Sequence, residues 1–126
     1  GTDIRVVADD AKFGLQEVKW GLLAAGGGTV RLPAQLPRAI GMELLLTGDL
    51  ISARRAERLG FVNHCVPGAQ VLPLAMQIAH KIANNAPLAV RNTRESARLS
   101  FGRVERDALQ LELLLAEPVM ACDDAR

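Results

Sequence analysis

The chain has 126 residues, the size of about one domain, and 49% of them are hydrophobic, which excludes a disordered chain. Fifteen basic and fourteen acidic residues give a formal charge of +1, so composition does not indicate a nucleic-acid partner. The longest apolar runs are too short to span a membrane. Cys65 and Cys122 match no metal-ligand spacing; they favour a reduced, cytoplasmic protein, with an opportunistic disulfide as the alternative.

A short strand and a glycine-rich turn are predicted in the first quarter of the chain. Ile4–Ala8 is a β-branched run with one charge, which is typical of a strand. Phe13-Gly14 is predicted to be extended, and residues 16–25 have no clean period, which indicates a loop or a single helical turn. Gly26–Gly28 then lead into a helix for which Thr29 is the expected N-cap.

The middle of the chain is predicted to be two helices and a second short strand. Residues 39–48 have a helical pattern, and Gly48 is the expected C-cap. Ser52 is the expected N-cap of a helix over residues 53–59. Residues 61–66 follow as a strand. Two such short strands cannot make a stable sheet alone, and we expect them to need partner strands that this chain does not supply.

Helices are predicted for the rest of the chain. Pro87 suits the first turn of a helix, and Pro118 is expected to limit the last one. The three predicted helices cover residues 71–82, 87–99 and 104–118.

The stretch Phe13–Thr29 is the best candidate for one wall of an active site. Glu17 lies among apolar side chains, namely Leu15, Val18, Trp20, Leu22 and Leu23. A carboxylate that loses hydration in such surroundings becomes suited to both accept and donate a proton. The alternative is a surface glutamate paired with Lys19 or Lys12.

Other chemistry is less well supported by the motifs. The N–H groups of Gly26–Gly28 suit an anion or a polarised oxygen, but a tight turn for close packing explains them equally. A phosphate-binding loop would need Lys where Gly27 stands, and no dinucleotide fingerprint is present. His64 and His80 have no ligand-spaced partner, so no metal site is expected.

Short segments along the whole chain match the pattern of one protein family. They are Asp3–Ala8, Ala11–Leu15, Glu17-Val18, Gly21-Leu22, Gly26–Gly28, Arg31–Pro33, Leu46–Asp49, Ala53–Ala56, Leu59–Asn63, Ile82–Val90 and Asp123–Arg126. On these segments the chain resembles the crotonase superfamily, the enoyl-CoA hydratase/isomerase group. The resemblance implies an α/β fold: part of a (ββα)n spiral core at residues 1–68, then an incomplete helical trimerisation region at residues 69–126. It also implies a homotrimer or a dimer of trimers.

The resemblance assigns a role to Glu17, which falls where the family has the second of two glutamates. In hydratases this pair holds the water that adds to C3 of a trans-2-enoyl-CoA thioester while C2 receives a proton. In isomerases the same glutamate moves a proton between C2 and C4. The expected substrate-binding residues are Gln16, Trp20, Leu22, Ala25 and Gly26. Coenzyme A is part of the substrate, and no other cofactor is expected.

The resemblance also implies that the chain is a fragment cut at both ends. The family's oxyanion-hole donors and first glutamate would lie upstream of Gly1, so we expect the chain alone to be inactive. A glutamate at that upstream position favours a hydratase, and an apolar residue favours an isomerase. Another acyl-CoA dehydratase and a non-catalytic assembly module are the further alternatives. Gln16, where the family often has Pro, is the departure that points to the module.

Overall fold

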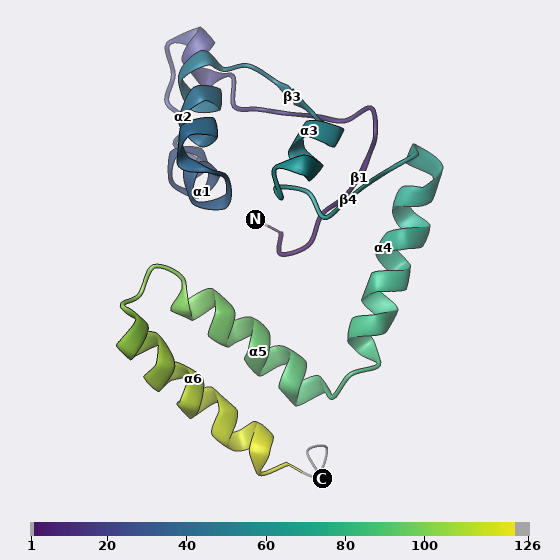
Figure 1. The fold of residues 1–126 in the computed structure, drawn as a ribbon, viewed down its shortest axis with the longest axis vertical. Helices are drawn as coiled ribbons and strands as arrows, with labels where there is room; N and C mark the ends of the chain where they lie inside the picture. Colours follow the sequence, from purple (N-terminus) through teal and green to yellow (C-terminus); the bar gives the residue numbers. More distant parts are fainter. Residues whose placement is uncertain (1, 123–126) are drawn as a thin grey trace. The chain divides into compact units, whose positions relative to one another are not determined.

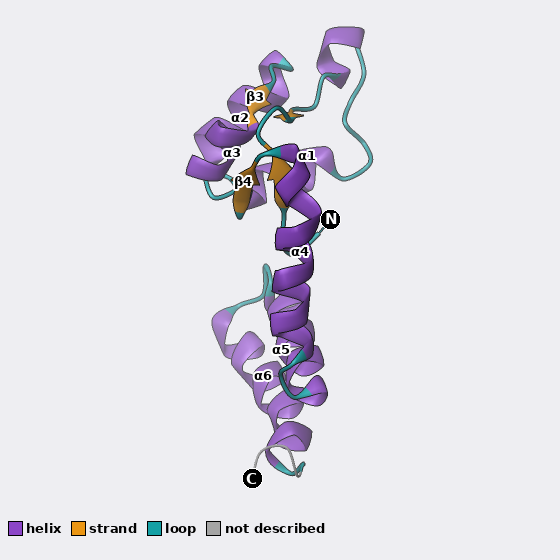
Figure 2. Cartoon of the chain, turned by 90° about the vertical axis from the view of Figure 1, so that its right-hand side faces the viewer, coloured by secondary structure: helices purple, strands orange, loops and turns teal. Residues whose placement is uncertain are grey.

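The computed structural model describes residues 2–122, in which short strands are interspersed with helices (Figure 1; Figure 2). The chain divides into two units, Gly1–Ala75 and Met76–Arg126. This division falls inside helix α4 (Gly68–Ala83), whereas the predicted domain boundary follows residue 68 and stays a prediction. The matching segment at 123–126 lies outside the described residues.

The strands of the first unit form two small pairs. β1 (Val6–Ala8) pairs in parallel with β4 (His64–Val66), and β2 (Lys12–Phe13) pairs antiparallel with β3 (Ile51–Ser52). The two predicted strands are therefore confirmed in shortened form, and they pair with each other. Sequence reasoning missed β3, because two residues are too few to show a strand period.

A small aliphatic core holds the first unit together. Its buried members are Leu36, Leu44, Ile51, Ala56 and Val62. Phe13 and Phe61 pack against this core. Their two rings contact each other edge to face, with centroids 5.6 Å apart. The ring contact joins β2, which contains Phe13, to the loop that contains Phe61. The Arg5 guanidinium lies 4.4 Å from the centroid of the Phe61 ring, a cation–π contact.

A glycine caps the start of α1, and another caps the end of α2. α1 (Gly28–Gln35) has Gly27 as its N-cap, with φ +94°, so the prediction of Thr29 as N-cap was wrong. A left-handed backbone is accessible to glycine and costly for threonine, which instead lies in the first turn. α2 (Arg38–Thr47) ends at Gly48 with φ +67°, as predicted.

α3 (Ala53–Arg58) has the predicted N-cap. The Ser52 hydroxyl oxygen accepts a hydrogen bond from the Arg55 N–H at 3.2 Å. This bond satisfies one of the donors that a helix start leaves without an intrahelical partner.

Replacing this cap should lower stability measurably. We expect Ser52→Ala to reduce the free energy of unfolding of the full-length protein by about 1 kcal/mol, because the Arg55 N–H loses its acceptor. Chemical denaturation checks this, with Ser52→Asp as the control that keeps an acceptor. Equal losses in both variants would contradict the capping role.

The second unit is built on a pair of helices. α5 (Pro87–Ser100) begins at Pro87 as predicted, and α6 (Glu105–Met120) packs along it, with the Asn92 amide donating to the Leu115 carbonyl at 2.7 Å (Figure 1). α6 continues through Pro118 to Met120, so the prediction that this proline limits the helix was wrong.

No helix within residues 2–122 combines the length and apolar character that a membrane span requires.

Candidate active site

A cavity of about 460 Å³ lies in the first unit, against the stretch predicted to form an active-site wall. That stretch contributes Phe13–Leu15, Glu17, Ala24 and Gly26–Gly28 to its lining. The core residues Leu36, Leu44 and Ile51 also line it. The cavity is thus mainly apolar, with a few polar groups at defined places, which is the usual composition of a small-molecule site.

Glu17 is the carboxylate of this cavity, and it begins the short 3₁₀ helix η1 (Glu17–Trp20). The turn is closed by hydrogen bonds from the Lys19 N–H to the Gln16 carbonyl at 2.9 Å and from the Leu22 N–H to the Glu17 carbonyl at 3.0 Å. Gly21, with φ +69°, ends it. Local backbone bonds therefore hold Glu17 at the cavity wall.

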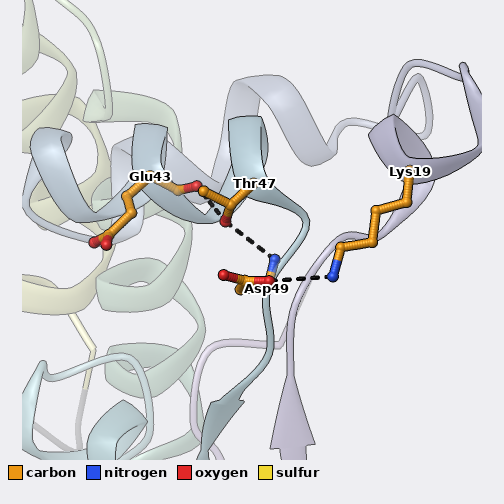
Figure 3. A network of polar contacts seen from close by, with 4 residues as sticks. All are labelled: Lys19, Glu43, Thr47 and Asp49. Carbon is orange, nitrogen blue, oxygen red and sulfur yellow. Dashed lines mark hydrogen bonds and ion pairs between the residues drawn. The ribbon is translucent and has the colours of Figure 1, made fainter.

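The Glu17 side chain is half-buried and makes neither a hydrogen bond nor an ion pair within residues 2–122. The alternative pairing with Lys19 is absent, because the Lys19 ammonium donates to Asp49 Oδ1 at 3.1 Å (Figure 3). A carboxylate at a cavity wall without a cation beside it can accept a proton from a bound water or substrate, which is the chemistry of a general base.

The other predicted substrate-binding residues do not all share the cavity. Gly26 lines it, whereas Gln16, Trp20, Leu22 and Ala25 are exposed and do not. The side chain of Trp20 is 79% exposed. The roles of these residues stay predictions.

Backbone hydrogen bonds occupy donors that sequence reasoning considered for a ligand. The Ala25 N–H donates to the Leu23 carbonyl at 2.7 Å, and the N–H groups of Gly28 and Thr29 both donate to the Ala24 carbonyl, at 3.1 and 3.4 Å. These groups stabilise the turn and the start of α1 rather than presenting free donors to the cavity.

The glycine turn has a clear packing role. A Cβ atom on Gly28 would lie 2.7 Å from Leu15 Cδ1 and 2.8 Å from the Ala24 Cβ, well inside van der Waals contact. The Arg31 guanidinium donates to the Gly26 carbonyl at 3.1 Å. The alternative of a tight turn for close packing therefore describes Gly28 better than an anion site does.

Arg5 and Gln35 are among the cavity residues that sequence reasoning missed. The Arg5 guanidinium donates to the Gln35 side-chain oxygen at 2.6 Å and to the Phe61 carbonyl, so it links the residue before β1 to α1 within the cavity lining. The one signal was a charge inside the apolar run Ile4–Ala8. Its partners are far away in sequence, so they follow only from the fold.

The described residues hold no group of three or more His, Cys, Asp and Glu side chains arranged for a metal ion. His64 and His80 are both exposed, on β4 and α4. Cys65 and Cys122 are free thiols.

Solved structures define the class of protein to which this fold and cavity belong. Enoyl-CoA hydratase from Mycobacterium tuberculosis matches 98% of the chain with a TM-score of 0.93 and 42% identity. Enoyl-CoA hydratase from Bacillus anthracis matches 98% with a TM-score of 0.94 and 35% identity. The chain covers 49% and 48% of these two structures. The predicted crotonase-like α/β fold is confirmed.

Sequence comparison gives the family. The model of the enoyl-CoA hydratase/isomerase family matches residues 1–126, and the chain belongs to that family. It is 40% identical to Enoyl-CoA hydratase EchA19 of Mycobacterium tuberculosis over 126 residues, all of this chain and 47% of that protein. It is 45% identical to (E)-benzylidenesuccinyl-CoA hydratase of Thauera aromatica over 97 residues, 77% of this chain and 38% of that protein. The chain thus spans less than half the length of these relatives.

Proposed function

We propose that the full-length protein is an enoyl-CoA hydratase that adds water across the 2,3 double bond of a trans-2-enoyl-CoA. One observation carries the proposal: in a chain of this family, Glu17 presents to a largely apolar cavity a half-buried carboxylate that has no partner among residues 2–122. The names of the relatives support hydration over isomerisation, because they describe hydratases and, in Proteus mirabilis, a carnitinyl-CoA dehydratase.

The proposed reaction gives Glu17 a defined task. Its carboxylate accepts a proton from the bound water as the water oxygen forms a bond to C3, and the π electrons of the double bond move toward the thioester carbonyl. The proton that Glu17 accepted is then delivered to C2, which restores the carboxylate, so the elements of one water molecule are added overall. The half-buried position of Glu17 suits this task, because its carboxylate lies at the wall of a largely apolar cavity where a water and a substrate can be held against it.

The proposed reaction needs groups besides Glu17. A second glutamate and the backbone donors for the enolate oxygen would come from the part of the protein outside this chain, so residues 1–126 alone should be inactive. We expect neither a metal nor a redox cofactor, since the addition of water causes no net oxidation or reduction and a carboxylate can carry the proton. We propose an acyl-CoA as the ligand, a homotrimer or dimer of trimers as the assembly, and the cytoplasm as the location.

An activity assay tests the proposal directly. With crotonyl-CoA, the full-length protein should remove the ultraviolet absorbance of the enoyl thioester and produce a 3-hydroxyacyl-CoA detectable by mass spectrometry. A 3-enoyl-CoA serves as the comparison substrate. Turnover of the 3-enoyl-CoA alone would contradict the hydratase proposal and support an isomerase. Turnover of neither substrate would favour the non-catalytic module.

A further inference from the structure

Three contacts hold the turn that carries Glu17 on the C-terminal end of α2. The first is the bond from the Lys19 ammonium to Asp49 Oδ1, at 3.1 Å (Figure 3). It joins η1 to the residue that directly follows the Gly48 cap of α2, so a turn from one part of the sequence is tied to a helix some thirty residues later.

The second contact is the close approach of the Lys19 stem to Gly48. A Cβ atom on Gly48 would lie 3.0 Å from both Cγ and Cε of Lys19 and 3.1 Å from Val18 Cγ1. Gly48 has φ +67° and ends α2. Because it has no Cβ atom, the aliphatic part of the Lys19 side chain can pack directly against it. The lysine therefore contributes packing as well as charge.

The third contact fixes Asp49 itself. Its N–H donates to the Thr47 hydroxyl oxygen at 3.1 Å, and the same hydroxyl donates to the Glu43 carbonyl at 2.8 Å (Figure 3). Asp49 is thus held by the last turn of α2, and its carboxylate is presented at a defined point to Lys19.

We propose that Lys19 and Asp49 are a positioning pair that sets where the Glu17 carboxylate lies relative to the rest of the cavity lining. The inference rests on the proposed function, because it takes Glu17 as the group that handles water. Glu17 and Lys19 belong to one 3₁₀ turn, and such a single turn has little stability of its own. Leu44 of α2 lines the cavity, so the helix whose C-terminal end anchors η1 also contributes to the cavity lining.

The Lys19–Asp49 pair should affect the rate of the reaction more than the stability of the protein. Lys19 and Asp49 are 43% and 68% exposed, and such an exposed pair contributes little to the free energy of unfolding. A displacement of about 1 Å at a reacting group can nevertheless cost up to about 100-fold in rate. The effect of removing the pair should therefore appear in kcat and not in unfolding.

The test uses the full-length protein with crotonyl-CoA. Lys19→Met keeps most of the stem and removes the charge; we expect kcat to fall about three- to tenfold, with KM and the denaturation midpoint nearly unchanged. Asp49→Asn should give the same loss, and the double variant should lose no more than either single one. Lys19→Arg should retain most of the rate, and Lys12→Met, at an exposed lysine outside the cavity lining, is the matched control.

A second background separates this inference from the proposed function. In Glu17→Gln protein, Lys19→Met should leave the residual rate unchanged, since the group that it positions is already lost. An equal fold-loss in both backgrounds would overturn the positioning role. An unchanged kcat in Lys19→Met and Asp49→Asn would also overturn it, while a large loss in Glu17→Gln alone would leave the proposed function standing.

Discussion

Replacing Glu17 by glutamine is expected to lower kcat of the full-length protein on crotonyl-CoA by about 10²–10⁴-fold. Glutamine keeps the size of the side chain but cannot accept the proton of the attacking water. The carboxylate lines the cavity without a partner among residues 2–122, so its loss should leave the surrounding structure intact. KM should change much less than kcat, because the interaction is made with the reacting water and not with coenzyme A.

The control for this experiment is Glu43→Gln. Glu43 is an exposed glutamate of α2 whose carboxylate lies 3.9 Å from an Arg55 nitrogen and does not line the large cavity. It should retain full activity. A rate in Glu17→Gln equal to that of the unchanged protein would remove Glu17 from the mechanism and with it the proposed hydratase assignment.

Shortening Leu44 to alanine should cause the largest loss of stability. Leu44 is 3% exposed, belongs to the core cluster, and lines the cavity from α2. Removing its branched end leaves a hole between α2 and β3, and we expect the free energy of unfolding of the full-length protein to fall by about 2–5 kcal/mol. Chemical denaturation of both forms measures the difference.

The matched control is the neighbouring Leu46→Ala. Leu46 lies on the same helix but is 67% exposed, so the same chemical change should cost less than about 0.5 kcal/mol. Equal losses at the two positions would contradict the assignment of Leu44 to the core and Leu46 to the surface of this unit.

Local features were predicted well because their causes are local. Ser52 caps α3 because its hydroxyl reaches a donor three residues on, and Gly48 ends α2 because glycine accepts a left-handed backbone. Thr29 failed as a cap for the same kind of reason: Gly27, two residues earlier, already offers the backbone conformation that starts the helix. The pattern also does not contain the close packing of Gly28 against Leu15, which follows only from the fold.

Glu17 was found from sequence because a carboxylate among apolar residues is rare, and the surrounding segments resembled one family. The partner of Lys19 was not found, since Asp49 is brought to it only when η1 packs on the end of α2. Arg5 was overlooked for the same reason: Gln35 and Phe61 meet it across the fold.

The amino-acid sequence by itself determined the family, the order of helices and strands apart from β3, and Glu17 as the candidate base, because these depend on residue types and short-range spacing. Only the tertiary structure decided that β1 pairs with β4, that Glu17 lacks a partner within residues 2–122, and that Lys19 binds Asp49. Such pairings depend on which distant surfaces can be buried together, and that depends on packing of the whole unit rather than on any local pattern.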